Sequence, residues 1–257
     1  KRQIMYSADK CIRCLLCTRT CRYGAITVKD GAPLFLREKC VGCGACVKAC
    51  PEDALHLSGK MMNVKEILDV VMKDKDYYDT TGGGVTISGG EAFVQFQGFL
   101  GLIKACKEVG LNVAVETCGQ VLFQHIREAE PYIDTLLYDI KHTDIKKLKE
   151  LTGEASPVMI DNLCSLSKIA PDKIVVRVPV IPGFNLEDGT IESIYHLALK
   201  LGIKRISLLP YHTLGKNKYA QLGRTYDFPE EKMLKKDMLF PFRELGARQG
   251  LQVTIGE

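Results

Sequence analysis

Cysteines are the residues of this chain whose type and spacing point most directly to chemistry. Eight of the 11 cysteines lie within the first 50 residues, in the runs CIRCLLCTRTC (residues 11–21) and CVGCGACVKAC (residues 40–50). Each run has the spacing C-x2-C-x2-C-x3-C, in which three thiolates converge on one 4Fe–4S cluster and the fourth binds another. The spacing therefore predicts one cluster on Cys11, Cys14, Cys17 and Cys50, and a second on Cys40, Cys43, Cys46 and Cys21.

Zinc ribbons and disulfides are the alternatives for these cysteines. Zinc sites use paired C-x2-C units rather than a triplet plus one, and disulfides need an oxidising compartment. Pro51 follows the second run, as this motif usually requires, whereas Arg22 follows the first. We expect the missing proline to soften a loop without removing a ligand.

Charge divides the chain at about the same place as the cysteines. Residues 1–50 contain 10 Lys/Arg against 3 Asp/Glu, and residues 51–257 contain 25 against 28. We predict a ferredoxin-like domain at residues 1–59 and a second domain at residues 60–257. Because a 4Fe–4S core held by four thiolates carries about −2, we interpret most of the basic residues as counter-charge for the clusters. A docking face for an acidic redox partner is a secondary interpretation.

Two partner classes are disfavoured by composition. The net charge of +4 over 257 residues is too small to indicate nucleic acid by itself. The sequence contains no run of about 18 apolar residues, so no transmembrane helix is predicted. We expect neither a nucleic-acid partner nor a membrane partner.

From residue 60 onward, apolar runs typical of buried strands alternate with segments of helical periodicity, which indicates a parallel α/β sheet. This part falls short of the ~250 residues of a full eight-stranded barrel, so we predict a partial, open barrel, with a doubly wound sheet as the alternative. The predicted strands are 84–88, 111–115, 135–140, 173–181, 205–209 and 251–255, and the predicted helices are 62–75, 95–109, 121–129, 163–170, 187–201 and 230–249.

Titratable residues follow five of these strands. In parallel α/β folds the carboxyl ends of the strands carry the ligand, so we expect these residues to share a site, although each alone could be a helix cap or a surface residue. Carboxylates beside cations suit a zwitterion that has both an ammonium and a carboxylate group. The residues concerned are Glu91, Glu116, Asp139, Lys141, Arg177 and His212.

Five motifs occur in order along the chain: ISGGE, ETCG, YDIKH, VRVPVIPGFN and LLPYHTLGKNKY. On these motifs the chain resembles the glycyl-radical-enzyme activating enzymes, relatives of pyruvate formate-lyase activating enzyme in the radical S-adenosylmethionine superfamily. The resemblance implies an α/β fold, a partial (β/α)6 radical-SAM barrel with a small bacterial-ferredoxin-like two-cluster domain. It also implies reductive cleavage of S-adenosylmethionine to a 5′-deoxyadenosyl radical, which takes a hydrogen from a glycine of a partner enzyme.

The resemblance also implies a set of residues that hold S-adenosylmethionine. They are Gly89, Gly90, Glu91, Glu116, Thr117, Asp139, Ile140, Lys141, Arg177 and His212. The loop 89–91 would receive the amino group, and residues 139–141 would form one wall.

Further roles follow from the same resemblance. Glu116 and Asp139, with Thr117, would hold a monovalent cation near the methionyl carboxylate. Arg177 and His212 would contact the carboxylate and the ribose or adenine. Glu116 stands where pyruvate formate-lyase activating enzyme has an aspartate.

One motif of the superfamily is missing from the chain. The catalytic 4Fe–4S cluster is held there by C-x3-C-x2-C after the first barrel strand, and no such run occurs among these 257 residues. Because the chain starts at Lys1 rather than Met, we interpret this strand and its cysteines as removed from the chain rather than lost in evolution. We therefore expect three 4Fe–4S clusters in the full-length protein, two of them ligated by this chain, and no S-adenosylmethionine cleavage by the chain as it stands.

The resemblance implies a cognate glycyl radical enzyme as partner, a flavodoxin or ferredoxin as electron donor, and the cytoplasm of an anaerobe. Two alternatives stay open. The first is a dicluster ferredoxin-type electron-transfer protein on an α/β scaffold, and the second is a non-catalytic S-adenosylmethionine-binding relative. Iron counting distinguishes both alternatives from an activating enzyme. Eight irons favour a carrier or a non-catalytic relative, and twelve favour an activating enzyme.

Overall fold

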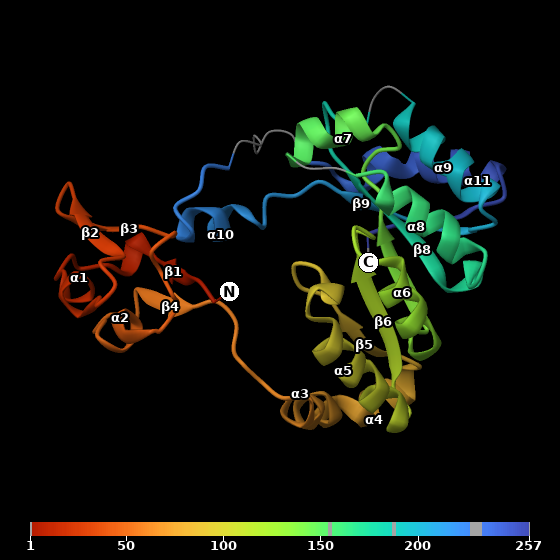
Figure 1. Cartoon of the computed structure of the whole chain (residues 1–257). Helices are drawn as coiled ribbons and strands as arrows, with labels where there is room; N and C mark the ends of the chain where they lie inside the picture. Colours follow the sequence, from red (N-terminus) through yellow and green to blue (C-terminus); the bar gives the residue numbers. More distant parts are fainter. Residues whose placement is uncertain (1, 154–155, 187–188, 227–232, 257) are drawn as a thin grey trace. The chain divides into compact units, whose positions relative to one another are not determined.

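The computed structural model describes residues 2–153, 156–186, 189–226 and 233–256. The chain forms two compact units (Figure 1). Unit 1 comprises residues 1–61 and 212–230, and unit 2 comprises residues 62–211 and 231–257.

This division differs from the predicted domains at two places, because residues 60–61 and residues 212–230 belong to unit 1 rather than to the larger domain. The physical reason for the second difference lies in helix α10 (Lys216–Gln221), which packs beside strand β1 (Ile4–Tyr6). The Arg37 guanidinium donates a hydrogen bond to the carbonyl oxygen of Gln221 at 3.0 Å. The side-chain amide of Gln221 donates to the Ser7 hydroxyl at 3.3 Å.

Unit 1 is built from two short antiparallel pairs, β1 with β4 (Leu55–Leu57) and β2 (Ile26–Lys29) with β3 (Ala32–Phe35). Its other elements are the 3-10 turn Ala8–Lys10 and the helices α1 (Leu16–Thr20), α2 (Ala45–Lys48) and α10. Asp30 and Gly31 join β2 to β3 and both have positive φ, 51° and 72°. This is the conformation that a two-residue Asp-Gly hairpin turn favours.

Unit 2 contains a six-stranded, all-parallel sheet whose order is β10-β9-β8-β7-β6-β5. Because the order follows the sequence without reversal, the sheet is wound in one direction, as in a barrel and unlike a doubly wound fold. The six predicted strands are confirmed, with bounds β5 (Gly84–Ile87), β6 (Asn112–Thr117), β7 (Thr135–Asp139), β8 (Ile174–Val180), β9 (Arg205–Pro210) and β10 (Gln252–Ile255).

Helices connect the strands and share one apolar core with the sheet (Figure 1). They are α3 (Val64–Val71), α4 (Lys75–Thr81), α5 (Phe96–Glu108), α6 (Phe123–Ala129), α7 (Ile145–Thr152), α8 (Val158–Ser167), α9 (Thr190–Lys200) and α11 (Phe240–Arg248). The 3-10 turns of this unit are Met72–Asp74, Ala92–Gln95, Glu130–Tyr132, Pro171–Lys173 and Lys236–Leu239.

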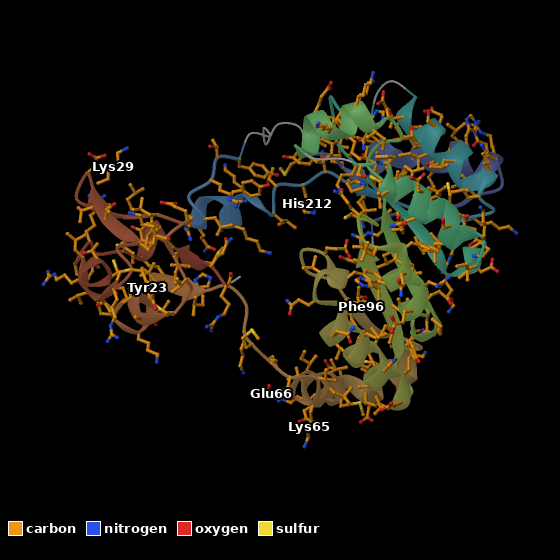
Figure 2. The ribbon with its side chains drawn as sticks, viewed as in Figure 1. Tyr23, Lys29, Lys65, Glu66, Phe96 and His212 are labelled. Carbon is orange, nitrogen blue, oxygen red and sulfur yellow. The ribbon has the colours of Figure 1, made fainter. Side chains whose placement is uncertain are left out.

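Helix bounds differ from the predictions where local capping overrides periodicity. Asn63 caps the N-terminus of helix α3. Its side chain accepts a hydrogen bond from the Glu66 N–H at 2.9 Å, and the side chain of Glu66 (labelled in Figure 2) accepts from the Asn63 N–H at 2.7 Å. Helix α7 was not predicted and is capped by Asp144, which accepts from the Lys146 N–H at 2.8 Å. The predicted helices 187–201 and 230–249 begin outside the described residues. Among the described helices, none has the length and apolarity needed to cross a membrane.

Candidate functional site

Two cavities in unit 1 are each lined by four cysteines. We call the first the Cys40 cavity and the second the Cys11 cavity. The Cys40 cavity is lined by Cys21, Cys40, Cys43 and Cys46, and the Cys11 cavity by Cys11, Cys14, Cys17 and Cys50. These are the two ligand sets that the spacing of the cysteines predicts.

The cavities suit a cluster better than a single ion. Among the described residues, no three His, Cys, Asp or Glu side chains converge closely enough to hold one metal ion. None of the eight thiols is in a disulfide bond. Four of them line each cavity. Tetrahedral zinc needs four sulfurs at ≈2.3 Å from one centre. The arrangement therefore fits two polynuclear centres and fits zinc or disulfides poorly.

Burial opposes ionisation of the innermost cysteines. It raises the pKa of Cys17, and it raises the pKa of Cys46 to about 11. Metal binding must therefore displace protons from these thiols, which makes loading more favourable as pH rises.

In unit 2, Glu91 lies directly after β5 and is held by the end of β6. Its carboxylate accepts from the Thr117 hydroxyl at 3.0 and 3.1 Å, and from the Cys118 backbone N–H at 3.0 Å. The Cys118 thiol is also within 3.2 Å, and burial together with this carboxylate raises the pKa of Cys118. The hydroxyl of Thr117, predicted to line a cation site, is therefore turned toward Glu91.

Close packing fixes the loop that carries these donors. Gly119 donates its N–H to the Thr117 hydroxyl at 3.0 Å and has a φ of +71°. A Cβ on Gly119 would lie 1.6 Å from the hydroxyl oxygen of Tyr138, which itself donates to the Met159 carbonyl at 2.6 Å. Only glycine fits at this position.

A second set of contacts joins the ends of β5, β6, β7 and β8. The carboxylate of Glu116 accepts hydrogen bonds from the Ser88 hydroxyl and from the Arg177 guanidinium. Asp139 lies between two cations, with one oxygen 3.6 Å from the Arg177 Nε and the other 3.7 Å from the Lys141 Nζ. Together with Glu91, this gives three carboxylates and two cations at one edge of the sheet.

The pKa values of the two carboxylates beside Arg177 are shifted in opposite directions. Burial alone would raise the pKa of Glu116, but hydrogen bonds from Ser88 and Arg177 hold it below its ordinary value. Burial dominates at Asp139 and raises its pKa, against the attraction of Lys141 and Arg177. The buried Oδ1 of Asp139 has no hydrogen bond among the described residues, and it is the oxygen that lies 3.6 Å from the Arg177 Nε.

The loop between β5 and Glu91 opens onto a hollow of about 350 Å³. Gly89 has a φ of +137°, and a Cβ on Gly89 or Gly90 would meet no atom within 4 Å. A ligand can therefore approach this backbone directly. The remaining walls of the hollow are mainly apolar side chains of α3 and α5, namely Val64, Ile67, Phe99 and Leu102.

Two predicted residues are placed differently from the rest. The side chain of Ile140 is fully buried in the core, and its N–H donates to the Arg177 carbonyl at 2.9 Å. Ile140 can therefore present only its backbone to a ligand. His212 belongs to unit 1, where its Nδ1 accepts from the Leu214 N–H at 3.3 Å (Figure 2). Its role in the site stays a prediction.

Sequence reasoning missed two residues that organise the site. The Ser88 hydroxyl donates a hydrogen bond to Glu116, and its position in ISGGE, directly after strand β5, was the available signal. Asn185 is fully buried, and its side-chain amide donates to the carbonyls of Lys141 and Pro179, both at 2.8 Å. Its oxygen accepts from the Ile181 N–H at 2.7 Å. Asn185 thereby joins the segments that follow β7 and β8.

Comparison with known proteins agrees with both units. A family of 4Fe–4S dicluster domains matches residues 10–55, and a family of 4Fe–4S single-cluster domains matches residues 36–155. The choline trimethylamine-lyase activating enzyme of Oleidesulfovibrio alaskensis is 36% identical over 234 residues, which cover 87% of this chain and 74% of that protein. This chain belongs to the family of glycyl-radical-enzyme activating enzymes.

Further relatives support this assignment. The trans-4-hydroxy-L-proline dehydratase activating enzyme of Clostridioides difficile is 33% identical over 258 residues, covering 99% of this chain and 85% of that protein. A domain of pyruvate-formate lyase-activating enzyme from Bacteroides vulgatus superposes with a TM-score of 0.55 at 23% identity, covering 68% of this chain and 99% of that one. The predicted α/β fold with a partial barrel is thereby confirmed for this activating enzyme, which matches 4Fe–4S cluster domains.

Proposed function

We propose that this activating enzyme binds S-adenosylmethionine at the carboxyl ends of β5 to β8. The observation that carries the proposal is the continuous set of contacts from Ser88 through Glu116, Arg177 and Asp139 to Lys141. Glu91 offers a carboxylate to the ammonium group beside the open loop 89–90. Arg177 and Lys141 supply positive charge for the methionyl carboxylate, so the site complements a zwitterion.

We also propose that the enzyme carries two 4Fe–4S clusters, one in each cysteine-lined cavity of unit 1. The chemical fit of four thiols around each cavity supports this assignment. When bound, such clusters supply one-electron transfer at low potential. The cysteines hold them, and the apolar residues that share the cavity walls, such as Ile4 and Leu55, limit access of water.

The donors predicted for a monovalent cation do not fit one. Both oxygens of Glu116 already accept hydrogen bonds, and the Thr117 hydroxyl is committed to Glu91. Two protein cations, Arg177 and Lys141, flank Asp139. We therefore assign the positive charge beside Glu116 and Asp139 to Arg177 rather than to a bound cation.

The partner that we propose is a glycyl radical enzyme, whose glycine would be the hydrogen donor. Relatives that are 33–37% identical are named for different lyases and dehydratases, so the proposal stops at the class of partner. A flavodoxin or ferredoxin is the proposed electron donor, supported by the excess of basic residues in 1–50.

Anaerobic reconstitution tests the function. We expect at least eight irons per chain and S-adenosylmethionine binding that is measurable by calorimetry. Twelve irons, together with deoxyadenosine formed under a low-potential reductant, would support the activating reaction in the natural polypeptide. Eight irons with no binding of S-adenosylmethionine would favour an electron carrier instead, and binding without deoxyadenosine would favour a non-catalytic relative.

A further inference from the structure

The two cluster cavities of unit 1 differ in the charge that lines them. Among the described residues lining the Cys40 cavity, Arg37 alone carries a charge. Among those lining the Cys11 cavity, Glu52 alone does. The cavities are otherwise matched in ligand number and mainly apolar lining. The asymmetry therefore places a positive charge at one cluster and a negative charge at the other.

Arg37 is held in place rather than free to move into solvent. Its guanidinium donates to the Ile4 carbonyl and, at 3.0 Å, to the Gln221 carbonyl of α10. It also lies over the ring of Phe35, with the guanidinium carbon 5.4 Å from the ring centroid. Arg37 is half-buried, whereas Glu52 is exposed. A half-buried charge is screened less by solvent and salt than an exposed one, so Arg37 should dominate the difference.

We propose that Arg37 makes the cluster of the Cys40 cavity the more easily reduced of the two. The inference rests on the proposed presence of two clusters. Reduction adds one electron, so the reduced cluster carries one more negative charge and is stabilised by a fixed nearby cation. Net charge, hydrogen bonds to sulfur and solvent exposure set the potential of such clusters.

The other two influences do not reverse this order. At the Cys11 cavity the Arg13 backbone N–H donates to the Cys11 sulfur at 3.4 Å, which also favours a reduced cluster. A long bond from a neutral donor is weaker than the field of a full charge. The Arg13 guanidinium also acts on Tyr6 of this cavity, but Arg13 is exposed and does not line the cavity, so solvent screens its charge more than that of Arg37. At the Cys40 cavity the ligand Cys43 is exposed, and water at a cluster again favours the more negative state. Electrons therefore occupy the Cys40 cavity first and the Cys11 cavity second.

A redox titration of the reconstituted chain, followed by electron paramagnetic resonance, tests the proposal. We expect two one-electron steps. We call the step at the higher reduction potential the upper step and the other the lower step. In Arg37→Gln the equilibrium constant for reduction in the upper step should fall about tenfold, which lowers its potential by 59 mV for one electron. The potential of the lower step should stay unchanged. Lys39→Gln is the matched control, because Lys39 is an exposed neighbour of Cys40, does not line the cavity, and loses the same charge. Its upper step should move by less than a third as much.

Other outcomes overturn the proposal in distinguishable ways. If Arg37→Gln moves the lower step, moves both steps equally, or moves neither, Arg37 does not set the order. A shift in Lys39→Gln as large as that in Arg37→Gln has the same consequence. If Arg37→Gln fails to load iron, Glu52→Gln provides the test. Removing this negative charge from the Cys11 cavity should raise only the reduction potential of the lower step. A wild-type chain with fewer than eight irons would contradict the two-cluster proposal itself.

Discussion

The two units arrange their functional residues in opposite ways. In unit 1 the buried core consists of Ile4, Cys17, Ile26, Cys46 and Leu55, so two of its members are proposed cluster ligands. In unit 2 a large apolar core lies beneath the sheet, and the polar residues at the strand ends bond one another. The proposed cofactors of unit 1 would therefore be part of its core, whereas the polar residues of the site in unit 2 are held by one another.

The largest expected effect is the response of the two units to loss of iron. Small domains with little core depend on metals for folding, so removing iron with a chelator should abolish amide protection throughout β1 to β4. Strands β6 to β9 should keep theirs, as measured by hydrogen exchange with mass spectrometry. Retained protection in unit 1 without iron would show that the comparison is wrong.

A pair of buried cysteines provides the matched variants. Cys46 and Cys106 are both almost fully buried, at 7% and 1% exposure, but only Cys46 lines a cluster cavity. Cys46→Ala should lose iron and the protection of unit 1. Cys106→Ala should keep the iron content of the wild type.

The next effect concerns Glu91, which lines the hollow beside the open loop 89–90. Glu91→Gln removes the negative charge opposite the ammonium group, and a hydrogen bond to a charged group contributes about 1.5–3 kcal/mol. The dissociation constant for S-adenosylmethionine should therefore rise roughly ten- to a hundredfold. Glu128→Gln, on the exposed face of α6, should leave the calorimetric affinity unchanged. Equal affinity in wild type and Glu91→Gln would remove Glu91 from the site.

A smaller effect is expected on the stability of unit 2. The Arg177 side chain is only 11% exposed, so Glu116→Gln leaves a largely buried cation with one carboxylate fewer and should lower the free energy of unfolding by about 1–3 kcal/mol at pH 7. The folded pKa of Glu116 lies below its ordinary 4.5. Its contribution is therefore fully present above pH 4.5 and is lost as pH falls through the folded value.

Thermal unfolding of wild type and Glu116→Gln between pH 7 and pH 3.5 measures this contribution. The difference in melting temperature should be largest near neutral pH and should shrink below pH 4.5. Glu128→Gln again serves as the control, with no such trend. A difference that is constant with pH would mean that the pair of Glu116 with Arg177 does not stabilise unit 2 through charge.

The features of this molecule that depend on local sequence spacing could be predicted, whereas those that depend on contacts between distant residues could not. The ligand sets of both cavities follow from cysteine spacing, because short loops constrain which sulfurs can converge. The strand-end residues Glu91, Glu116 and Asp139 follow from the alternation of strands and helices. The placement of 212–230 in unit 1 could not be predicted, because it depends on contacts between residues far apart in the sequence, from Arg37 to Gln221 and from Gln221 to Ser7. Asn185 was missed for a similar reason, since its role lies in the carbonyls that it joins.

The smallest expected effect tests whether the site of unit 2 is complete without an external ion. Since Arg177 already bonds Glu116 and lies 3.6 Å from Asp139, replacing sodium with potassium or choline should change the affinity for S-adenosylmethionine by less than twofold. Arg177→Gln removes the cation beside Glu116, and its affinity should become dependent on the salt because Glu116 then lacks a partner charge, whereas Asp139 keeps Lys141 at 3.7 Å. If the wild type instead needs potassium, a cation displaces Arg177 from Glu116, and unit 2 depends on an added cofactor as unit 1 does.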